Sequence, residues 1–419
     1  MSRLNQNRIG YKETIVGWIP NEWEIRPFRE IASRRKDRFD PNSNGKSFKC
    51  IELEHIEQGS GVILGYVDSS KLASSKNKFF PGDVLFGKLR PYLRKYAHID
   101  FEGVCSSEIW VLKNQKPSIS EYVYLIVQSN KFIAFSNKTS GTKMPRSEWD
   151  LISDVLFPLP PIYEQRKITE ILRYCDKEIE LVGKQIESKQ RLKNGLMQQL
   201  LTGKMRFPQF GKPRIANRLP PGWHKVALEK LLVPVTRFVN WDENAIYDQA
   251  IVRRWSQGLQ YRDLLFGHQI KTKTLQQIYE DDFLISNIQA AYGAMARVTE
   301  KFHNAHVSNL YTILNPRNED SMDIYYLDYL SQMPRFRHLV VVSANGFKAE
   351  RIRLNFSLPN FLKEKIIVPI AIEEQRKIAS TFLFLDREIG QLSKKKQNLE
   401  FQKRGLMQKL LSGEMRVKV

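Results

Sequence analysis

Cysteine is scarce in this sequence of 419 residues, which contains only Cys50, Cys105 and Cys175. An odd number of widely spaced cysteines excludes a disulfide framework and a Cys-X-X-Cys zinc site, and it is typical of a reducing cytoplasm. The sequence has no uncharged apolar run of the roughly 18 residues that a membrane-spanning helix needs. The segment Met1–Pro20 is polar and lacks the apolar stretch of a secretory signal. We therefore expect a cytoplasmic protein with no membrane contact.

Catalytic motifs are also missing. The sequence has no Asn-Pro-Pro-Tyr-type adenine-methylation motif, no Gly-X4-Gly-Lys-(Ser/Thr) loop for ATP and no Gly-X-Gly-X-X-Gly fingerprint. Asp83 and Lys88 have the residue types of a nuclease site, but the Pro-Gly turn before Asp83 is a simpler explanation. His303 and His306 have no nearby cysteine or carboxylate pair, which favours surface or packed histidines over metal ligands. We expect a chain without enzyme activity, bound cofactor or metal ion.

Positive charge, by contrast, is abundant. The 66 Lys and Arg residues outnumber the 45 Asp and Glu residues, giving a formal net charge of +21. Such a chain repels itself, and the usual partner that offsets this repulsion is a polyanion. A merely soluble basic surface is the alternative. The composition therefore favours a nucleic-acid-binding protein.

An internal repeat divides the sequence into two halves. The peptide Glu-Gln-Arg-Lys-Ile at position 164 recurs 210 residues later (374 − 164), and Gly-Leu-Met-Gln at position 195 recurs at the same offset. A weaker repeat opens each half, where Trp23 and Trp223 follow prolines at an offset of 200 (223 − 23). The second half therefore carries about ten additional residues between its two landmarks. Such a repeat predicts a globular–helix–globular–helix order.

Each Glu-Gln-Arg-Lys-Ile peptide opens a segment with heptad spacing. Apolar residues recur at alternating steps of four and three, which is typical of a helix that packs one stripe against a partner helix. Gly203 and Gly413 lie where a C-terminal glycine cap is expected. The residues that we predict at the helix pair or at a partner interface are Ile168, Leu172, Ile179, Ile186, Gly195, Leu196, Leu200, Ile378, Leu385, Ile389, Leu392, Leu399, Gly405, Leu406 and Leu410.

We expect the two helices to pair antiparallel within one chain. This register sets Ile186 near Leu392 and Ile179 near Leu399. It also places Lys189 and Lys403 opposite apolar residues, with their stems along the seam. Pairing of each helix with its copy in a second chain is the alternative. The two matched glycines at positions 195 and 405 each cost about 1 kcal/mol in a helix, which suggests the close approach of another backbone, such as a partner subunit.

The motifs resemble those of the specificity subunits of type I restriction–modification enzymes. The resemblance rests on Gly17–Glu24, on Pro158–Gln165, on the Gly-Leu-Met-Gln helix ends, and on Pro81–Phe86 and Ser140–Arg146 in the first half. The second half departs from the pattern: Pro369 lacks a neighbouring proline, and Asn-Gly-Phe-Lys at position 345 stands in place of Gly-Thr-Lys. These departures make the transfer of residue roles to the second half less secure.

The resemblance implies an α+β fold. It consists of two similar target-recognition domains, each a mixed β-sheet with helices, separated by two long antiparallel helices that form a coiled-coil spacer with pseudo-twofold symmetry. The segments that we expect are a first target-recognition domain (1–157), a central long helix (158–203), a linker (204–222), a second target-recognition domain (223–365) and a C-terminal long helix (366–419).

The resemblance further implies sequence-specific binding of double-stranded DNA with an asymmetric two-part target. The implied partners are two DNA adenine methyltransferase subunits and two restriction and translocase subunits, which would bind S-adenosylmethionine, ATP and Mg²⁺. Two alternatives are a self-sufficient nuclease or methyltransferase with unrecognised motifs, and a basic coiled-coil scaffold.

Candidate DNA contacts follow from side-chain chemistry. Arginine can bind guanine through two hydrogen bonds, asparagine and glutamine can do the same with adenine, and lysine more often contacts phosphate. A solvated basic surface is the alternative for each cluster. The candidates are Lys88, Arg90, Arg94, Lys143, Arg146, Arg253, Arg254, Asn287, Gln289, Lys348 and Arg351.

Overall fold

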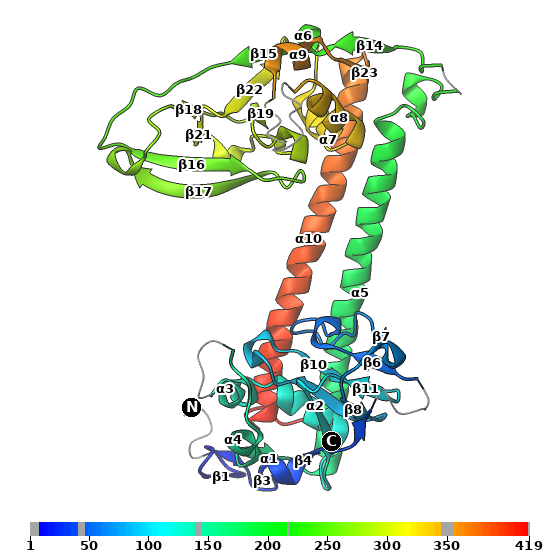
Figure 1. Ribbon diagram of the computed structural model, residues 1–419, viewed down its shortest axis with the longest axis vertical. Helices are drawn as coiled ribbons and strands as arrows, with labels where there is room; N and C mark the ends of the chain where they lie inside the picture. The colour runs from blue at the N-terminus through cyan, green and yellow to red at the C-terminus, as the bar shows by residue number, and fades with distance from the viewer. Residues whose placement is uncertain (1–7, 41–46, 139–143, 216–217, 345–355, 418–419) are drawn as a thin grey trace. The chain divides into compact units, whose positions relative to one another are not determined.

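The computed structural model describes residues 8–40, 47–138, 144–215, 218–344 and 356–417 (Figure 1). The chain forms two compact units, one made of Met1–Gly183 with Lys394–Val419 and the other of Lys184–Ser393. Helix α5 (Ile162–Leu200) begins in the first unit and ends in the second, and α10 (Ile372–Leu411) does the reverse. None of the helices in the described ranges is long and apolar enough to cross a membrane.

The first unit is built on a four-stranded antiparallel sheet in the order β10-β9-β12-β4, and on a five-stranded sheet in the order β5-β8-β11-β6-β7. Strands β13 and β3 form a further antiparallel pair that precedes α5. In chain order its elements before α5 are β1 (Tyr11–Lys12), β2 (Ile19–Pro20), β3 (Glu24–Pro27), α1 (Phe28–Ile31), β4 (Ala32–Arg34), β5 (Arg38–Phe39), β6 (Lys49–Ile51), β7 (Val67–Asp68), β8 (Lys76–Phe79), β9 (Val84–Gly87), β10 (Tyr96–His98), β11 (Gly103–Cys105), β12 (Ile109–Asn114), α2 (Ser120–Gln128), α3 (Asn130–Ser136), α4 (Trp149–Ser153) and β13 (Leu156–Leu159).

The second unit repeats this topology. Its sheets have the orders β20-β19-β22-β15 and β18-β21-β16-β17, and β23 pairs with β14 before α10. Its elements between α5 and α10 are β14 (Trp223–Ala227), α6 (Leu228–Leu231), β15 (Leu232–Val235), β16 (Ile246–Val252), β17 (Leu259–Phe266), β18 (Leu275–Gln277), β19 (Phe283–Ser286), β20 (Met295–Arg297), β21 (His306–Ser308), β22 (Tyr311–Pro316), α7 (Ile324–Ser331), α8 (Pro334–Val342), α9 (Leu358–Lys363) and β23 (Lys365–Pro369).

The second unit departs from the first in three places. The counterpart of strand β5 is a single bridge between Phe238 and Gln276. A 3₁₀ helix at Glu300–Phe302 follows β20, whereas residues 99–102 after β10 contain no helix. The hairpin β16–β17 has strands of seven and eight residues, compared with three and two in β6 and β7. The duplicated frame therefore tolerates different lengths of hairpin and loop.

The central strands β9 and β19 each contribute to two apolar cores. Val84 and Phe86 belong to the cluster that contains α2, whereas Leu85 belongs to a second cluster. In the other unit, Phe283 and Leu284 are divided between two clusters in the same way. Successive side chains of a strand point to opposite faces, so a run of consecutive apolar residues forms a strand that is buried on both sides.

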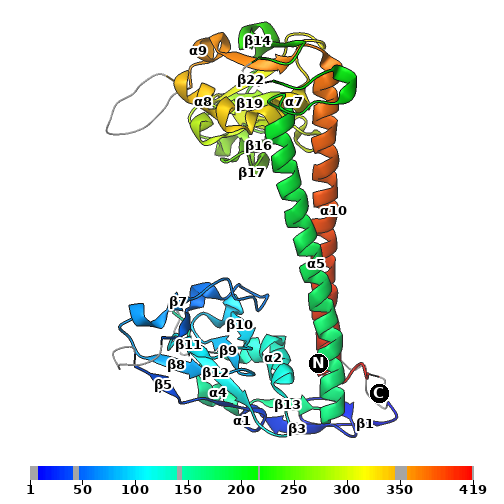
Figure 2. The same ribbon diagram turned by 90° about the vertical axis from the view of Figure 1, so that its right-hand side faces the viewer.

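The two long helices pack antiparallel in both units (Figure 2). In the first unit Lys403 Nζ lies 2.5 Å from Asp176 Oδ1, and in the second unit Lys193 Nζ lies 2.6 Å from Asp386 Oδ1. These two ion pairs are equivalent under the 210-residue repeat. The antiparallel pairing within one chain that the heptads predict is thereby confirmed, as is the expected α+β fold with its internal repeat.

Two lysines that interrupt the heptads have acidic partners that the sequence pattern did not indicate. Lys189 Nζ lies 2.8 Å from Glu388 Oε2, and Lys403 pairs with Asp176, so neither ammonium group depends on apolar neighbours alone. The acidic partners lie beside the apolar stripe on the opposite helix. The lysines that interrupt the heptads are therefore compensated by charge.

Helices α5 and α10 end in the same way. Gly203 and Gly413 have positive φ angles of 69° and 72°, as expected of glycine caps. A Cβ atom on Gly203 would lie 2.6 Å from Pro220 Cγ, and one on Gly413 would lie 2.4 Å from Pro20 Cδ. Glycine is required at both positions, because the chain must turn and the proline before each repeated tryptophan packs against it.

A buried cluster joins three parts of the chain in each unit, and we call it the junction cluster. It contains the repeated tryptophan, the glutamate of the Glu-Gln-Arg-Lys-Ile peptide, and the arginine that follows the end of the opposite long helix. Its members are Trp23, Glu164 and Arg416 in the first unit, and Trp223, Glu374 and Arg206 in the second.

In the second unit, Arg206 donates two hydrogen bonds of 2.7 Å to the two carboxylate oxygens of Glu374. The Trp223 indole N–H donates to the same carboxylate over 3.2 Å. Glu374 is 1% exposed, so its charge has little contact with water. The adjacent Gln375 accepts a hydrogen bond from Asp323 N before α7 and donates to Pro369 O. The repeated peptide therefore fixes the start of α10 to three neighbouring segments.

We predict that Glu374→Ala destabilises the second unit by about 3–5 kcal/mol, because Arg206 then keeps a buried charge without its partner. Scanning calorimetry of the full chain, together with hydrogen exchange at β14, measures the effect. The matched control is Glu373→Ala, which removes an exposed carboxylate from the same helical turn and should cost less than about 1 kcal/mol. Equal losses for the two variants would contradict the proposed role of the cluster.

Candidate nucleic-acid interface

Two loops that follow the central strands hold equivalent positions in the two units. After β9, Lys88 N donates to Glu108 O over 2.9 Å, and Ser147 N donates to Lys88 O over 2.8 Å. After β19, Asn287 N donates to Leu310 O, and Phe356 N donates to Asn287 O. Because the backbone partners correspond, Lys88 and Asn287 occupy the same place, as do the residues two positions later, Arg90 and Gln289.

In the first unit this loop brings together three of the predicted DNA contacts. Arg90 is exposed and has a left-handed backbone with φ of 52°. Arg90 N donates to Pro145 O, and the Leu89–Arg146 bridge places Arg146 alongside. Arg146 Nε lies 3.0 Å from Glu108 Oε2, which partly offsets its charge. Lys88, Arg90 and Arg146 therefore form one basic group.

In the second unit the predicted contacts also lie together. The amide oxygen of Asn287 accepts a hydrogen bond from Thr312, and Gln289 directly precedes the 3₁₀ helix Ala290–Tyr292. The tip of the β16–β17 hairpin lies against this helix, with the Arg254 guanidinium 4.8 Å from the centre of the Tyr292 ring. Arg253 is exposed on the same tip. The hairpin thus adds arginine side chains beside the two amides.

Arg94 has a different environment from the other candidates. Its guanidinium donates to Gln128 O over 3.1 Å and to Asn130 Oδ1 over 2.7 Å, where α2 ends and α3 begins. These bonds attach the loop to the helical layer. Lys143, Lys348 and Arg351 lie outside the described residues.

The hairpin tip of the first unit turns at two glycines. Gly59 and Gly61 have φ angles of 76° and 80°. Gly59 N donates to Arg94 O, and the Tyr96 hydroxyl donates to Gly59 O over 2.8 Å. Burial raises the pKa of Tyr96 to about 12. The tip is therefore held against the loop that carries Arg90.

Tyr292 and Arg337 belong to this surface, although the side-chain chemistry of the sequence did not single them out. Arg337 lies on α8, and its guanidinium is 5.8 Å from the centre of the Trp255 ring. Tyr292 is 40% exposed. No motif of the sequence indicated either residue, and only the structure places them beside the hairpin tip.

Asp83 and His303, two of the residues considered for a catalytic or metal site, have structural partners, whereas the buried Nδ1 atom of His306 has no hydrogen-bond partner among the described residues. Asp83 is 2% exposed and accepts hydrogen bonds from Arg35 Nε and Phe80 N. Asp282 does the same with Arg237 and Tyr279 N in the second unit, which indicates a repeated turn. His303 Nδ1 accepts a hydrogen bond from Glu280 N. In the part of the chain that the structure describes, no group of three or more His, Cys, Asp and Glu residues is placed to hold a metal ion.

The predicted interface residues of the helices fall into two groups. Gly195 and Gly405 are exposed, and among the described residues no atom outside their own helical turns lies within 4 Å of a Cβ atom placed on either. Tyr174 and Phe384 are equivalent under the repeat and are 59% and 61% exposed. The remaining predicted residues are buried or half-buried: Ile168, Leu172, Ile179, Ile186, Leu196, Leu200, Ile378, Leu385, Ile389, Leu392, Leu399, Leu406 and Leu410.

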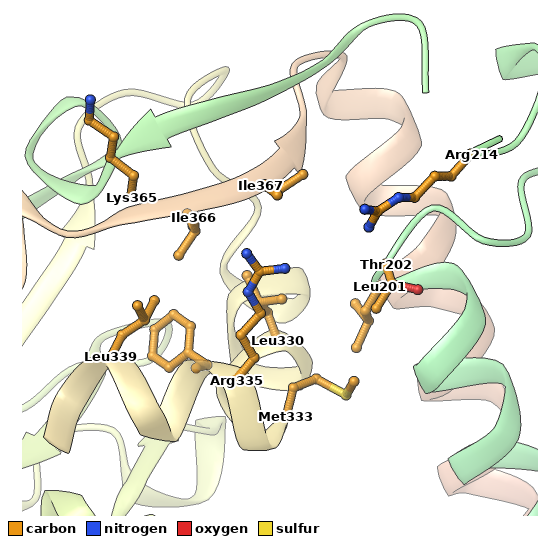
Figure 3. A pocket seen from close by; sticks show the side chains of 11 residues that line it. Leu201, Thr202, Arg214, Leu330, Met333, Arg335, Leu339, Lys365, Ile366 and Ile367 are labelled. Atoms are coloured by element: carbon orange, nitrogen blue, oxygen red, sulfur yellow. The ribbon is translucent and has the colours of Figure 1, made fainter. Parts of the chain in front are cut away.

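A separate apolar pocket of about 60 Å³ lies in the second unit. Figure 3 shows Met333 and Leu339 near α8, with Ile366 of β23 opposite and Arg335 beside them. No candidate DNA contact lines this pocket. It is therefore distinct from the surface around Asn287 and Gln289.

Comparisons with known proteins agree with this architecture. Residues 20–189 match the family described as type I restriction modification DNA specificity domain. The chain is 25% identical over 445 aligned positions to a putative type I restriction enzyme specificity subunit, MjaX, of Methanocaldococcus jannaschii, covering 97% of both chains. It is 28% identical over 212 positions to the EcoDI specificity subunit of Escherichia coli, a match that spans only 48% of this chain and 45% of that relative.

Solved structures show the same fold. A chain from a study of the assembly of a type I restriction–modification system superimposes with a TM-score of 0.61 at 20% identity, covering 95% of this chain and 99% of that one. The type I S subunit from M. genitalium gives a TM-score of 0.54 at 13% identity, covering 93% and 96%. The family match, the end-to-end relative and the duplicated fold agree: residues 20–189 match the type I DNA specificity domain, and the chain as a whole is similar to specificity subunits of type I restriction enzymes.

Proposed function

We propose that each unit reads one half of a two-part DNA target and that the two halves differ in base sequence. The observation that carries this proposal is the presence of unlike side chains at equivalent loop positions. Arg90 in the first unit corresponds to Gln289 in the second, and Lys88 corresponds to Asn287. Arginine suits guanine, whereas asparagine and glutamine suit adenine. One framework with different side chains would read an asymmetric target.

The two long helices would set the number of unread base pairs between the half-sites. Helices α5 and α10 are each continuous from one unit into the other. In DNA-binding proteins with two reading elements, the spacing of the half-sites follows from the geometry that connects those elements. The helices would therefore determine the length of the gap and not the bases that are read.

The partners in this proposal are two DNA adenine methyltransferase subunits and two restriction subunits. S-adenosylmethionine, ATP and Mg²⁺ would then be bound by these partners. Support comes from surfaces that occur once in each repeat: Tyr174 and Phe384 are exposed aromatic residues at equivalent positions, and Gly195 and Gly405 are exposed helical glycines. Aromatic residues are enriched at protein interfaces, and two equivalent surfaces would bind two copies of one partner.

We predict that Arg90→Ala relaxes base preference in one half-site and Gln289→Ala in the other, each at a cost of about 1–3 kcal/mol in target binding. Lys88→Ala should instead weaken binding to all duplexes and reduce its salt dependence, as expected for a phosphate contact. Selection from a random duplex library by the chain in complex with its methyltransferase measures both effects. Arg173→Ala, an exposed arginine on α5, serves as the control. A loss of preference in both half-sites from a single loop variant would contradict the assignment.

Insertion of seven residues after Gly183 and seven after Ser393 should change the gap while leaving the base preferences unchanged. Seven residues preserve the heptad and lengthen each helix by about 10 Å, which corresponds to about three base pairs at 3.4 Å each. Affinity should fall as well, because three base pairs turn the second half-site by roughly a third of a helical turn. The same selection measures the preferred gap, and an unchanged gap would refute the spacer role.

The double variant Tyr174→Ala and Phe384→Ala should weaken binding of each methyltransferase subunit by about five- to thirtyfold, because one aromatic contact worth about 1–2 kcal/mol is lost from each proposed docking surface. Each single variant should leave a complex with one methyltransferase. Native mass spectrometry measures this stoichiometry. Leu264→Ala, an exposed apolar side chain on β17, is the control. Unchanged stoichiometry in the double variant would exclude these positions as docking sites.

A further inference from the structure

The tip of the β16–β17 hairpin has an unusual backbone. Trp255 and Ser256 have φ angles of 60° and 54°, a left-handed conformation that bulky side chains rarely adopt. The corresponding tip of the first unit uses Gly59 and Gly61 for its positive φ angles, and glycine adopts them without steric cost. A strained conformation persists only where the surrounding structure imposes it, and such residues are concentrated at functional sites.

The surroundings of Trp255 do impose this conformation. Trp255 N donates to Tyr292 O over 2.8 Å, and Ser256 N donates to Gly293 O over 3.0 Å. Arg253 N donates to Gly258 O and closes the turn. The bond from Ser256 to Gly293 is equivalent to the bond from Gly59 to Arg94 in the first unit. In both units the hairpin tip is therefore bonded to the corresponding loop, whereas only the second unit carries a tryptophan, Trp255, at its tip.

Packing does not account for the indole. Trp255 is 63% exposed. A cavity of about 260 Å³ lies beneath the same tip, lined by residues that include Ser256, Gly258, Asp328 and Gln332, and Trp255 does not line it. In the first unit Tyr124 stands in the position of Asp328, and its hydroxyl would lie 1.9 Å from a Cβ atom placed on Gly61. Space for a ring is therefore available under the second tip, and the indole does not use it.

The surface around Trp255 is basic and aromatic. The ring centres of Trp255 and Tyr292 are 6.2 Å apart, and the guanidinium groups of Arg254 and Arg337 lie against these two rings. Exposed Arg253 and Ile288 lie nearby on the tip and on the loop that follows β19. Arginine beside an exposed ring suits a polyanion with stacked bases, because the cation contacts phosphate while the ring contacts a base face or a thymine methyl group.

We propose that Trp255 is a specificity-determining residue of the second unit, inserted into a DNA groove by the hairpin tip as an apolar contact to the bases of one half-site. This proposal rests on the proposed function, in which the second unit reads that half-site. In this arrangement the hairpin tip contacts the DNA beside Asn287 and Gln289. The arginines around the tip contact the phosphate backbone of the DNA on either side of the groove. The first unit has a glycine tip at this place, so the contact contributes to the difference between the half-sites.

The variants Trp255→Gly and Trp255→Phe test this contact in the full chain bound to its methyltransferase. Glycine favours the left-handed backbone, so Trp255→Gly keeps the turn and removes only the ring. We expect this variant to bind the target selected by the wild type at least tenfold more weakly, to bind a scrambled duplex unchanged, and to lose base preference only in the half-site that Gln289→Ala affects. Trp255→Phe should retain most of the affinity. Phe238→Ala removes an exposed ring elsewhere in the unit and is the control.

Tryptophan fluorescence gives an independent readout. Target DNA should quench the emission of the wild type more than that of Trp255→Phe, although six of the seven tryptophans remain in the variant. If the wild type selects a two-part target and Trp255→Gly binds it with unchanged affinity and preference, the inference is overturned and the proposed function stands. If the wild type selects no sequence, the proposed function itself fails.

Discussion

The junction cluster is the interaction on which the rest of the architecture depends. In each unit a buried glutamate at the start of one long helix accepts hydrogen bonds from a tryptophan indole and from an arginine beyond the end of the other helix. A buried carboxylate is stable only when it is paired and hydrogen-bonded, so the three segments must meet. Once these three segments meet, the junction cluster fixes the antiparallel register of α5 and α10 at that end of the helix pair.

This constraint explains why the repeat is strongest at the helices and weak in the reading loops. Glu164 and Glu374, like the glutamines that follow them, are nearly fully buried and serve the same partners in both units. The loops after β9 and β19 share only backbone hydrogen bonds, which any side chain can satisfy. Lys88 and Asn287 can therefore differ without disturbing the frame. The fold therefore requires the residues of the junction cluster, whereas the loop residues can differ between units with different functions.

Much of the helical architecture could be predicted from the sequence, because a periodic apolar stripe and a repeat of fixed offset have one simple antiparallel solution. The partners of Lys189 and Lys403 were missed, since Glu388 and Asp176 lie beside the stripe and not in it. The role of Arg94 at the end of α2 depends on a contact between residues far apart in sequence. The left-handed tip at Trp255 and Ser256 was not predictable either, because neither residue type is typical of positive φ angles. The domain boundaries and the individual DNA contacts stay predictions.

The composition of the two units has a consequence for their biosynthesis. The second unit is one continuous stretch, Lys184–Ser393, whereas the first needs Lys394–Val419 in addition to Met1–Gly183. Met407 and Leu410 belong to the apolar core of the first unit, and Arg416 completes its buried ion pair. On the ribosome, the first unit is thus the first to be translated and the last to have all its parts. Until the segment with Met407, Leu410 and Arg416 emerges, the early α5 segment lacks part of its apolar core and the Glu164 carboxylate has only the indole of Trp23 as a partner, while the second unit can already close.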